Sequence, residues 1–162
     1  VHPTITPSMD IQVSSNFARA LLAAYDRAGG AVAQLMAELK SGGFHISQGA
    51  LEALREHFSS GRSDEDETSA MITHAQQTMG ELLCPHSAVG VKVAEEHMGP
   101  DPMVTLATAH PAKFPDAVKA ATGIHAPLPP RMADLYDRAE RITRVGNDLA
   151  AIQAVIRERA KT

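Results

Sequence analysis

The chain has 162 residues, enough for one ordinary domain, and its 44% hydrophobic and 21% charged residues are typical of a globular protein. A net charge of −4 without a basic patch argues against nucleic acid and anionic membranes as partners, and no apolar run is long enough to span a membrane. Cys84, the lone cysteine, predicts a reducing, cytoplasmic location and is expected to be a small buried hydrophobe.

The first 13 residues are predicted to form an extended N-terminal segment, because Pro3 and Pro7 bias the residues before them away from helix. The sequence starts at Val1 rather than at a methionine, and we interpret this start as a cut within a longer protein. Residues 14–162 are then predicted to form one helix-rich C-terminal portion.

Apolar residues at helical spacing, bounded by capping and breaking residues, predict helices up to residue 83. Gly29 and Gly30 are expected to end the first, and the second runs over about residues 31–40. Residues 63–66 match a capping box, with acidic side chains where the helix dipole favours them; a cation site there is the less favoured alternative. The predicted N-caps are Ser14 or Ser15 for the first helix and Ser47 for the third.

Strand and helix signals mix after residue 84. Residues 89–93 alternate as a strand does, but the charged residues around them favour helix, which we predict. Residues 103–107 form a short apolar run between turn signals and are the best candidate for a buried strand, with residues 141–145 as a second. The expected fold class is α/β and helix-dominated, with several helices and a few short strands.

Three further helices are predicted in the C-terminal part. Pro111 suits the first position of one that Gly123 ends, and a short one follows the proline-rich connector at about residues 132–136. Asn147 is expected to cap a terminal helix. The side chains that this last helix should bury are Leu149, Ile152, Val155 and Ile156.

The most informative stretch is ATAHPAKF at residues 107–114, which follows the first predicted strand. It delivers the Thr108 hydroxyl, the His110 imidazole and the Lys113 amine at the mouth of a helix. Open α/β sheets bind ligands outside the carboxyl ends of their strands, and helix starts attract anions. On this pattern alone, packing and capping explain the residues better than a ligand site does.

This stretch resembles a signature of threonine synthases. Other segments resemble the same family and occur in the family order, so that the resemblance covers almost the whole chain. They are SMDIQVSSNF at residues 8–17, PHSA at residues 85–88 with Gly90, and NDLAA at residues 147–151.

The resemblance implies a fold-type II enzyme that uses pyridoxal 5′-phosphate (PLP) and is related in fold to the tryptophan synthase β chain. It implies conversion of O-phosphohomoserine and water into threonine and phosphate. Thr108 matches the family hydroxyl that contacts the pyridine nitrogen of PLP, and a hydroxyl can donate to a neutral nitrogen. The alternative for Thr108 is a strand-end threonine that bonds only to backbone.

The other chemical side chains of the motifs carry weaker assignments. His110 is interpreted as a capping or core histidine, and Lys113 either meets a phosphate or lies on the solvent face of a first turn. Asp10 and Ser14 are interpreted as turn and cap residues. Cys84 departs from the family, which usually has an acid before the Pro-His pair.

The chain lacks the groups that would anchor the cofactor. The family's Schiff-base lysine lies in a Ser-Phe-Lys-Asp type motif, and none of the lysines has that setting; the asparagine- and glycine-rich phosphate loop is also absent. We therefore assign no catalytic residue here, and expect this portion alone to hold no PLP and to be inactive. The lysines are Lys40, Lys92, Lys113, Lys119 and Lys161.

Metal and hydrolase functions are disfavoured, because the sequence contains no zinc-ligand spacing and no nucleophile elbow. Two hypotheses remain. The chain is either the C-terminal part of a threonine synthase, whose partner is the missing N-terminal portion of the same enzyme, or a non-catalytic helical binding module derived from that family. An upstream Ser-Phe-Lys-Asp type motif in the reading frame would favour the first.

Overall fold

The computed structural model describes residues 3–11 and 13–160, and these form a helix-rich fold. The chain divides into two compact units, of which the first ends at Pro127 and the second begins at Leu128. This boundary falls within the proline-rich connector, where fixed backbone angles favour a stiff link.

The first three helices of the N-terminal unit begin close to the predicted positions. They are α1 (Ser15–Ala24), α2 (Gly29–Ser41) and α3 (Gln48–Arg55), and α1 packs against both of the others. The Ser14 and Ser47 side chains accept from backbone amides of their first turns, as predicted for caps. The prediction that Gly29 and Gly30 end the first helix is wrong: α1 ends at Ala24, and the two glycines begin α2. The reversal lies at Asp26 and Arg27, whose positive φ angles turn the backbone.

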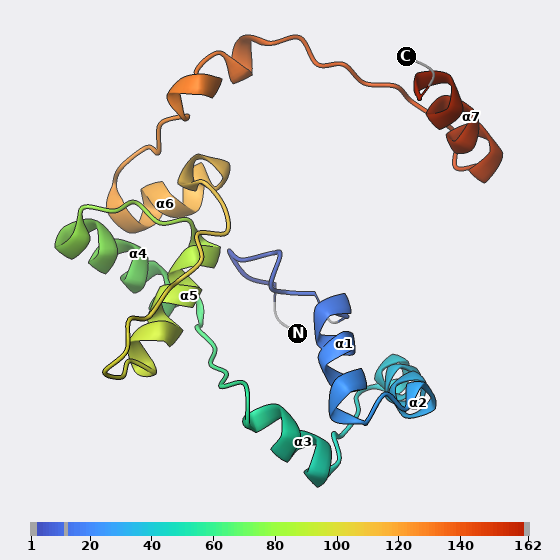
Figure 1. The fold of residues 1–162 in the computed structure, drawn as a ribbon. Coiled ribbons are helices and arrows are strands. Elements are labelled where there is room, and N and C mark those ends of the chain that lie inside the picture. The colour runs from blue at the N-terminus through green and yellow to red at the C-terminus, as the bar shows by residue number, and fades with distance from the viewer. Residues whose placement is uncertain (1–2, 12, 161–162) are drawn as a thin grey trace. The chain divides into compact units, whose positions relative to one another are not determined.

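Three more helices build the main core of this unit. Helix α4 (Glu65–Met79) packs against α5 (Pro85–Glu96) and α6 (Pro115–Thr122), as Figure 1 shows. The capping box lies one residue later than predicted, with Asp64 as N-cap and Glu67 as its partner. Helix at residues 85–96 confirms the choice of helix over strand there. The core side chains are Met71, Ile72 and Ala88, with Leu83, Val91 and Ala121 packed around them.

The prediction of short strands is wrong for the residues that the structure describes, because none of them forms a strand. Residues 103–107 are extended but have no neighbouring strand, and Val104 and Leu106 remain 79% and 76% exposed. Residues 141–145 are likewise irregular. A strand needs a partner for its backbone groups, and the described chain supplies none.

The N-terminal segment does not run straight over its described part. Residues 7–9 form a turn in which the Met9 amide donates to the Thr6 carbonyl over 2.8 Å. The Asp10 carboxylate closes the loop by accepting from the Thr4 amide and hydroxyl, each at 2.7 Å. This geometry confirms the interpretation of Asp10 as a turn residue.

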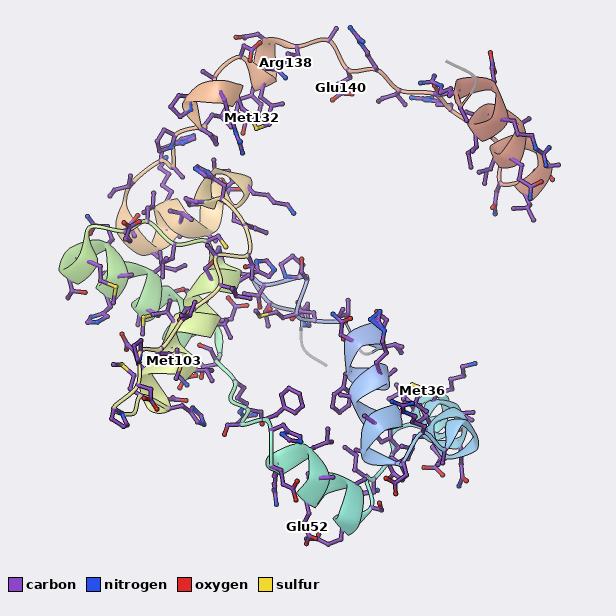
Figure 2. All side chains as sticks on the ribbon, viewed as in Figure 1. Met36, Glu52, Met103, Met132, Arg138 and Glu140 are labelled. Carbon is purple, nitrogen blue, oxygen red and sulfur yellow. The ribbon has the colours of Figure 1, made fainter. Side chains whose placement is uncertain are left out.

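The C-terminal unit contains little buried surface. Two 3-10 turns, η2 (Pro130–Met132) and η3 (Leu135–Asp137), stand where one short helix was predicted, and a stretch that includes Arg138 and Glu140 leads toward α7 (Figure 2). Helix α7 (Leu149–Arg159) is capped by Asp148 rather than by Asn147. The prediction that its apolar residues are buried is wrong within this chain: Leu149, Ile152 and Ile156 are exposed.

Candidate functional site

The first turn of α5 is the most deeply buried polar region that the structure describes. Cys84 caps the helix through its sulfur, which accepts from the Ser87 amide, and Pro85 takes the first helical position, where no amide donor is needed. Residues 84–88 are all buried. Burial of Cys84 confirms that prediction, and its capping role explains why a residue with a side-chain acceptor stands there.

Thr108 approaches this turn from the extended segment after α5. Its amide donates to Ser87 Oγ over 3.1 Å, and its own Oγ1 lies 3.4 Å from the same oxygen. The Cys84 sulfur lies 3.2 Å from Ser87 Oγ and 3.9 Å from Thr108 Oγ1. Ser87 is buried while Thr108 is an exposed residue, so the cluster joins a buried helix start to an exposed segment.

His86, the neighbour of Ser87, joins three segments of the unit. Its Nε2 accepts from the Ser8 amide over 3.1 Å, and its ring lies 4.7 Å from that of Phe114. Burial lowers the pKa of His86 below its ordinary value, the nearby Lys113 cation lowers it further, and Asp10 opposes both. Its Nδ1 is buried without a hydrogen-bond partner.

The contacts of Ser8, His86 and Ser87, Thr108 and Phe114 therefore bring three of the four family-like segments together at one helix start. The fourth segment, residues 147–151, belongs to the C-terminal unit. The segments had been singled out only by their residues. Their convergence gives them a common physical role, because each supplies a contact that the others need.

The two remaining side chains of the 107–114 motif have structural contacts. The Nδ1 of His110 accepts from the Ala112 amide over 3.2 Å and caps a 3-10 turn, η1 (Pro111–Lys113), which confirms its interpretation as a capping residue. The ammonium of Lys113 lies 5.6 Å from the centre of the Phe114 ring, within cation–π range, and Lys113 is exposed.

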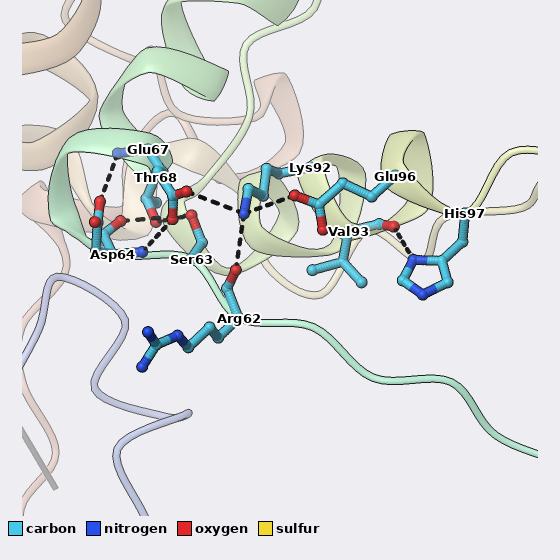
Figure 3. Close-up of polar contacts among 9 residues, drawn as sticks. All are labelled: Arg62, Ser63, Asp64, Glu67, Thr68, Lys92, Val93, Glu96 and His97. Atoms are coloured by element: carbon cyan, nitrogen blue, oxygen red, sulfur yellow. Dashed lines mark hydrogen bonds and ion pairs between the residues drawn. The ribbon is translucent and has the colours of Figure 1, made fainter. Parts of the chain in front are cut away.

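A second polar cluster ties the start of α4 to α5 (Figure 3). The Lys92 ammonium lies 2.8 Å from a Glu96 carboxylate oxygen, 3.2 Å from one of Glu67, and donates to the Arg62 carbonyl. The hydrogen bond to Glu96 is the main cause that raises the pKa of Lys92. The pKa of Glu67 is lowered, chiefly because its carboxylate accepts from the Asp64 amide. These charges satisfy one another, so the cluster is structural.

An apolar groove of about 660 Å³ lies between α1 and α3. Two of its lining residues, Asn16 and Phe17, belong to the first family-like segment, and Phe58 on its wall is 62% exposed. None of the residues around Thr108 lines it. The groove is therefore separate from the polar cluster at α5, and it leaves apolar surface uncovered.

Metal-binding side chains do not gather in the part of the chain that the structure describes: no three of His, Cys, Asp and Glu come close enough to hold an ion. Within the same residues, no helix is both long and apolar enough to cross a membrane.

Known proteins resemble the chain over nearly its whole length. Residues 87–156 match the family model described as "Threonine synthase, C-terminal". The threonine synthase of Pseudomonas aeruginosa is 44% identical over 96% of this chain, and that of Eremothecium gossypii is 37% identical over 98%. The chain belongs to the threonine synthase family. It spans 34% and 36% of the lengths of these two relatives.

Two solved threonine synthases share the fold. The crystal structure of PLP-bound threonine synthase from Brucella melitensis covers 100% of this chain with 52% sequence identity and a TM-score of 0.85, and the chain covers 35% of it. Threonine synthase from yeast matches with 31% identity and a TM-score of 0.75. The helix-rich fold is thus that of a C-terminal part of threonine synthases, and the resemblance seen in the sequence motifs is confirmed.

Sequence reasoning did not identify the contact between Ser87 and Thr108, although both residues lay in motifs that had been quoted. Their separation of 21 residues hides it from any local periodicity. Local side-chain signals concern bonds to backbone within a few residues, so they do not reveal this contact.

Proposed function

We propose that this chain is the C-terminal portion of a threonine synthase, which converts O-phosphohomoserine and water into threonine and phosphate with PLP. The observation that carries the proposal is the exposed residue Thr108 inside a motif of that family, with its hydroxyl 3.4 Å from that of Ser87. Its proposed partner is the missing N-terminal portion of the same enzyme, which would cover the apolar surfaces left open on α7 and in the groove.

The Thr108 hydroxyl suits the pyridine nitrogen of PLP as a hydrogen-bond donor. A hydroxyl donates to a neutral pyridine nitrogen without favouring its protonation, as a carboxylate would. We propose that Thr108 makes this contact and holds the ring at its nitrogen end. PLP supplies an electron sink for the reacting substrate carbon, and the lysine and phosphate loop that anchor it would come from the N-terminal portion.

Because the groups that anchor PLP would lie in the N-terminal portion, we expect the isolated chain to be inactive. None of its four described lysines belongs to a motif that could anchor the cofactor, and Lys92 is already held by two carboxylates. We expect no phosphate release from O-phosphohomoserine when PLP is added to the 162-residue chain. Turnover comparable with that of an intact threonine synthase would contradict the proposal that the missing portion is required.

A Thr108→Val substitution in the intact enzyme tests the cofactor contact. Valine keeps the shape of threonine and removes the hydroxyl, so the protein should still fold. A buried acceptor left without its donor costs about 1–3 kcal/mol, which corresponds to a rate loss of roughly tenfold to a hundredfold if it applies in the transition state. The measurements are steady-state phosphate release and the absorbance of bound PLP. Thr143→Val, at an exposed position of the C-terminal unit, is the matched control. An unchanged rate and spectrum in Thr108→Val would withdraw the assignment.

A non-catalytic binding module derived from the same family is the alternative. The reading frame decides between the two functions. A Ser-Phe-Lys-Asp type motif upstream of residue 1 supports the enzyme, and a start codon near residue 1 with no such motif supports the module.

A further inference from the structure

The Ser87 hydroxyl stands between helix α5 and the segment that carries Thr108. Ser87 is only 3% exposed, and its oxygen is within hydrogen-bond range of both polar groups of Thr108. The backbone contact is the shorter, because the Thr108 amide donates to Ser87 Oγ over 3.1 Å. A buried hydroxyl thus fixes where an exposed residue sits.

The side-chain bond between Ser87 and Thr108 can run in either direction. Ser87 Oγ uses one lone pair for the Thr108 amide, and its own proton then has Thr108 Oγ1 at 3.4 Å and Cys84 Sγ at 3.2 Å as acceptors. Thiol sulfur is a weak acceptor, and this sulfur already accepts from the Ser87 amide. The Ser87 proton can meet either acceptor, and an outside acceptor for the Thr108 proton selects the arrangement in which Ser87 donates to Thr108 Oγ1.

This direction leaves the proton of the Thr108 hydroxyl free. It cannot point at Ser87, whose own proton occupies that line, and the Cys84 sulfur at 3.9 Å is a long and weak alternative. The Thr108 proton is therefore available to an acceptor outside the cluster, on the solvent side of an exposed residue. A neutral ring nitrogen is such an acceptor.

The helix face that carries Ser87 also determines how closely residues 105–108 approach α5. Gly90 lies three residues after Ser87 and so projects from the same side of the helix. A Cβ atom built at Gly90 would lie 3.3 Å from the Thr105 methyl carbon, which is tighter than an ordinary van der Waals contact. The absent side chain at residue 90 thus lets residues 105–108 lie close enough for Ser87 to reach Thr108.

We propose that Ser87 is a positioning residue that holds the Thr108 backbone and directs the Thr108 hydroxyl outward as a hydrogen-bond donor. The proposal rests on the proposed contact between Thr108 and the PLP ring nitrogen, and it adds the group that makes this contact directional. Cys84 contributes as the cap that fixes the first turn of α5, where Ser87 lies.

The test compares variants of the intact PLP-bound enzyme. Ser87→Ala removes the hydroxyl, Ser87→Thr keeps it, and Thr108→Val removes the donor that it directs. Ser69→Ala on α4 is the matched control, since this serine is half-buried and its hydroxyl makes no hydrogen bond. The measurements are hydrogen exchange of a peptide spanning residues 103–110, the absorbance spectrum of bound PLP, and kcat and KM, with the melting temperature as a check on folding.

For Ser87→Ala we expect faster exchange at the Thr108 amide and a spectral shift in the same direction as for Thr108→Val. The loss of one ordinary hydrogen bond corresponds to a decrease in kcat of about twofold to tenfold. KM should change less than kcat. Ser87→Thr should restore both the exchange rate and the spectrum, and Ser69→Ala should match the unmodified enzyme in all measurements.

The outcomes separate this inference from the function on which it rests. If Thr108→Val shifts the spectrum but Ser87→Ala does not, the positioning role is wrong and the cofactor contact stands. If Ser87→Ala slows the reaction while exchange at Thr108 is unchanged, or Ser87→Thr fails to restore the spectrum, the positioning role is also wrong. If Thr108→Val changes neither spectrum nor rate, the cofactor contact fails and the inference fails with it.

Discussion

Acidification should weaken the fold through His86 before the carboxylates are protonated. The imidazole is only 5% exposed and its Nε2 accepts from the Ser8 amide, a bond that requires an unprotonated nitrogen. Burial is the main cause that lowers the pKa of His86. The Lys113 charge lowers this pKa further, and Asp10 opposes both effects. Protonation would place a second donor against the Ser8 amide and a charge in a buried site.

The sign follows from proton linkage. Because the pKa of His86 is lower in the folded state, the unfolded chain binds more protons in the range between the two pKa values, and stability rises with pH there. The contribution is fully present above the unfolded pKa of about 6.5 and is lost as the pH falls toward the folded value. One proton sets a maximum slope of about 1.4 kcal/mol per pH unit for this group.

His86→Phe isolates this contribution, because it keeps a ring against Phe114 and removes both nitrogens. We expect the free energy of unfolding in urea to fall between pH 7.5 and 5.5 more steeply in the unmodified protein than in the variant. The variant also loses the buried, unpartnered Nδ1, whose burial costs about 1–3 kcal/mol, so its stability at low pH should equal or exceed that of the unmodified protein. His45→Gln, at an exposed position, is the control. Parallel pH curves for the unmodified protein and His86→Phe would refute this reasoning.

Two further substitutions test the packing around α5. Lys92→Met should lower the melting temperature, because it breaks the pairs with Glu67 and Glu96, and the loss should shrink in 1 M salt; equal losses at low and high salt would contradict an ionic origin. Gly90→Ala should stabilise helix α5 by about 1 kcal/mol, because alanine favours helix more than glycine does. Its Cβ atom should also push Thr105 away, so we expect a higher melting temperature together with faster hydrogen exchange over residues 105–108. Slower exchange over these residues would argue against the close approach.

The helices of this chain could be predicted because their signals are local. Ser47 caps where the sequence places it, and Ser14 is one of the two predicted caps of α1, since a cap needs only its own side chain and the amide three residues later. Where two capping residues adjoin, as with Asp64 after a serine and Asp148 after an asparagine, the prediction was wrong by one residue. Propensity alone does not choose between such neighbours, because each can accept the same kind of bond.

Contacts between distant segments could not be predicted in this way. The extended run at residues 103–107 has the composition of a buried strand, but whether it pairs depends on another segment, and the described chain offers none. Thr108 was identified as a candidate from its motif. Its support by Ser87 depends on how α5 approaches it, which Gly90 permits and no periodicity reveals.

Several large apolar side chains of this chain are exposed to solvent. Helix α7 carries Leu149 and Ile156 on its surface, 70% and 60% exposed, and Val104 and Leu106 project from the unpaired run after α5. Burying such a side chain contributes about 1.5–3 kcal/mol, so their exposure leaves this stabilisation unrealised within the described residues. The chain spans about a third of its relatives' length, and these open surfaces are those that the proposed N-terminal portion would cover. The polar cluster at the start of α5 differs from them. Its polar groups bond to one another, and His86 Nδ1 is the one buried polar side-chain atom of the described residues that has no hydrogen-bond partner.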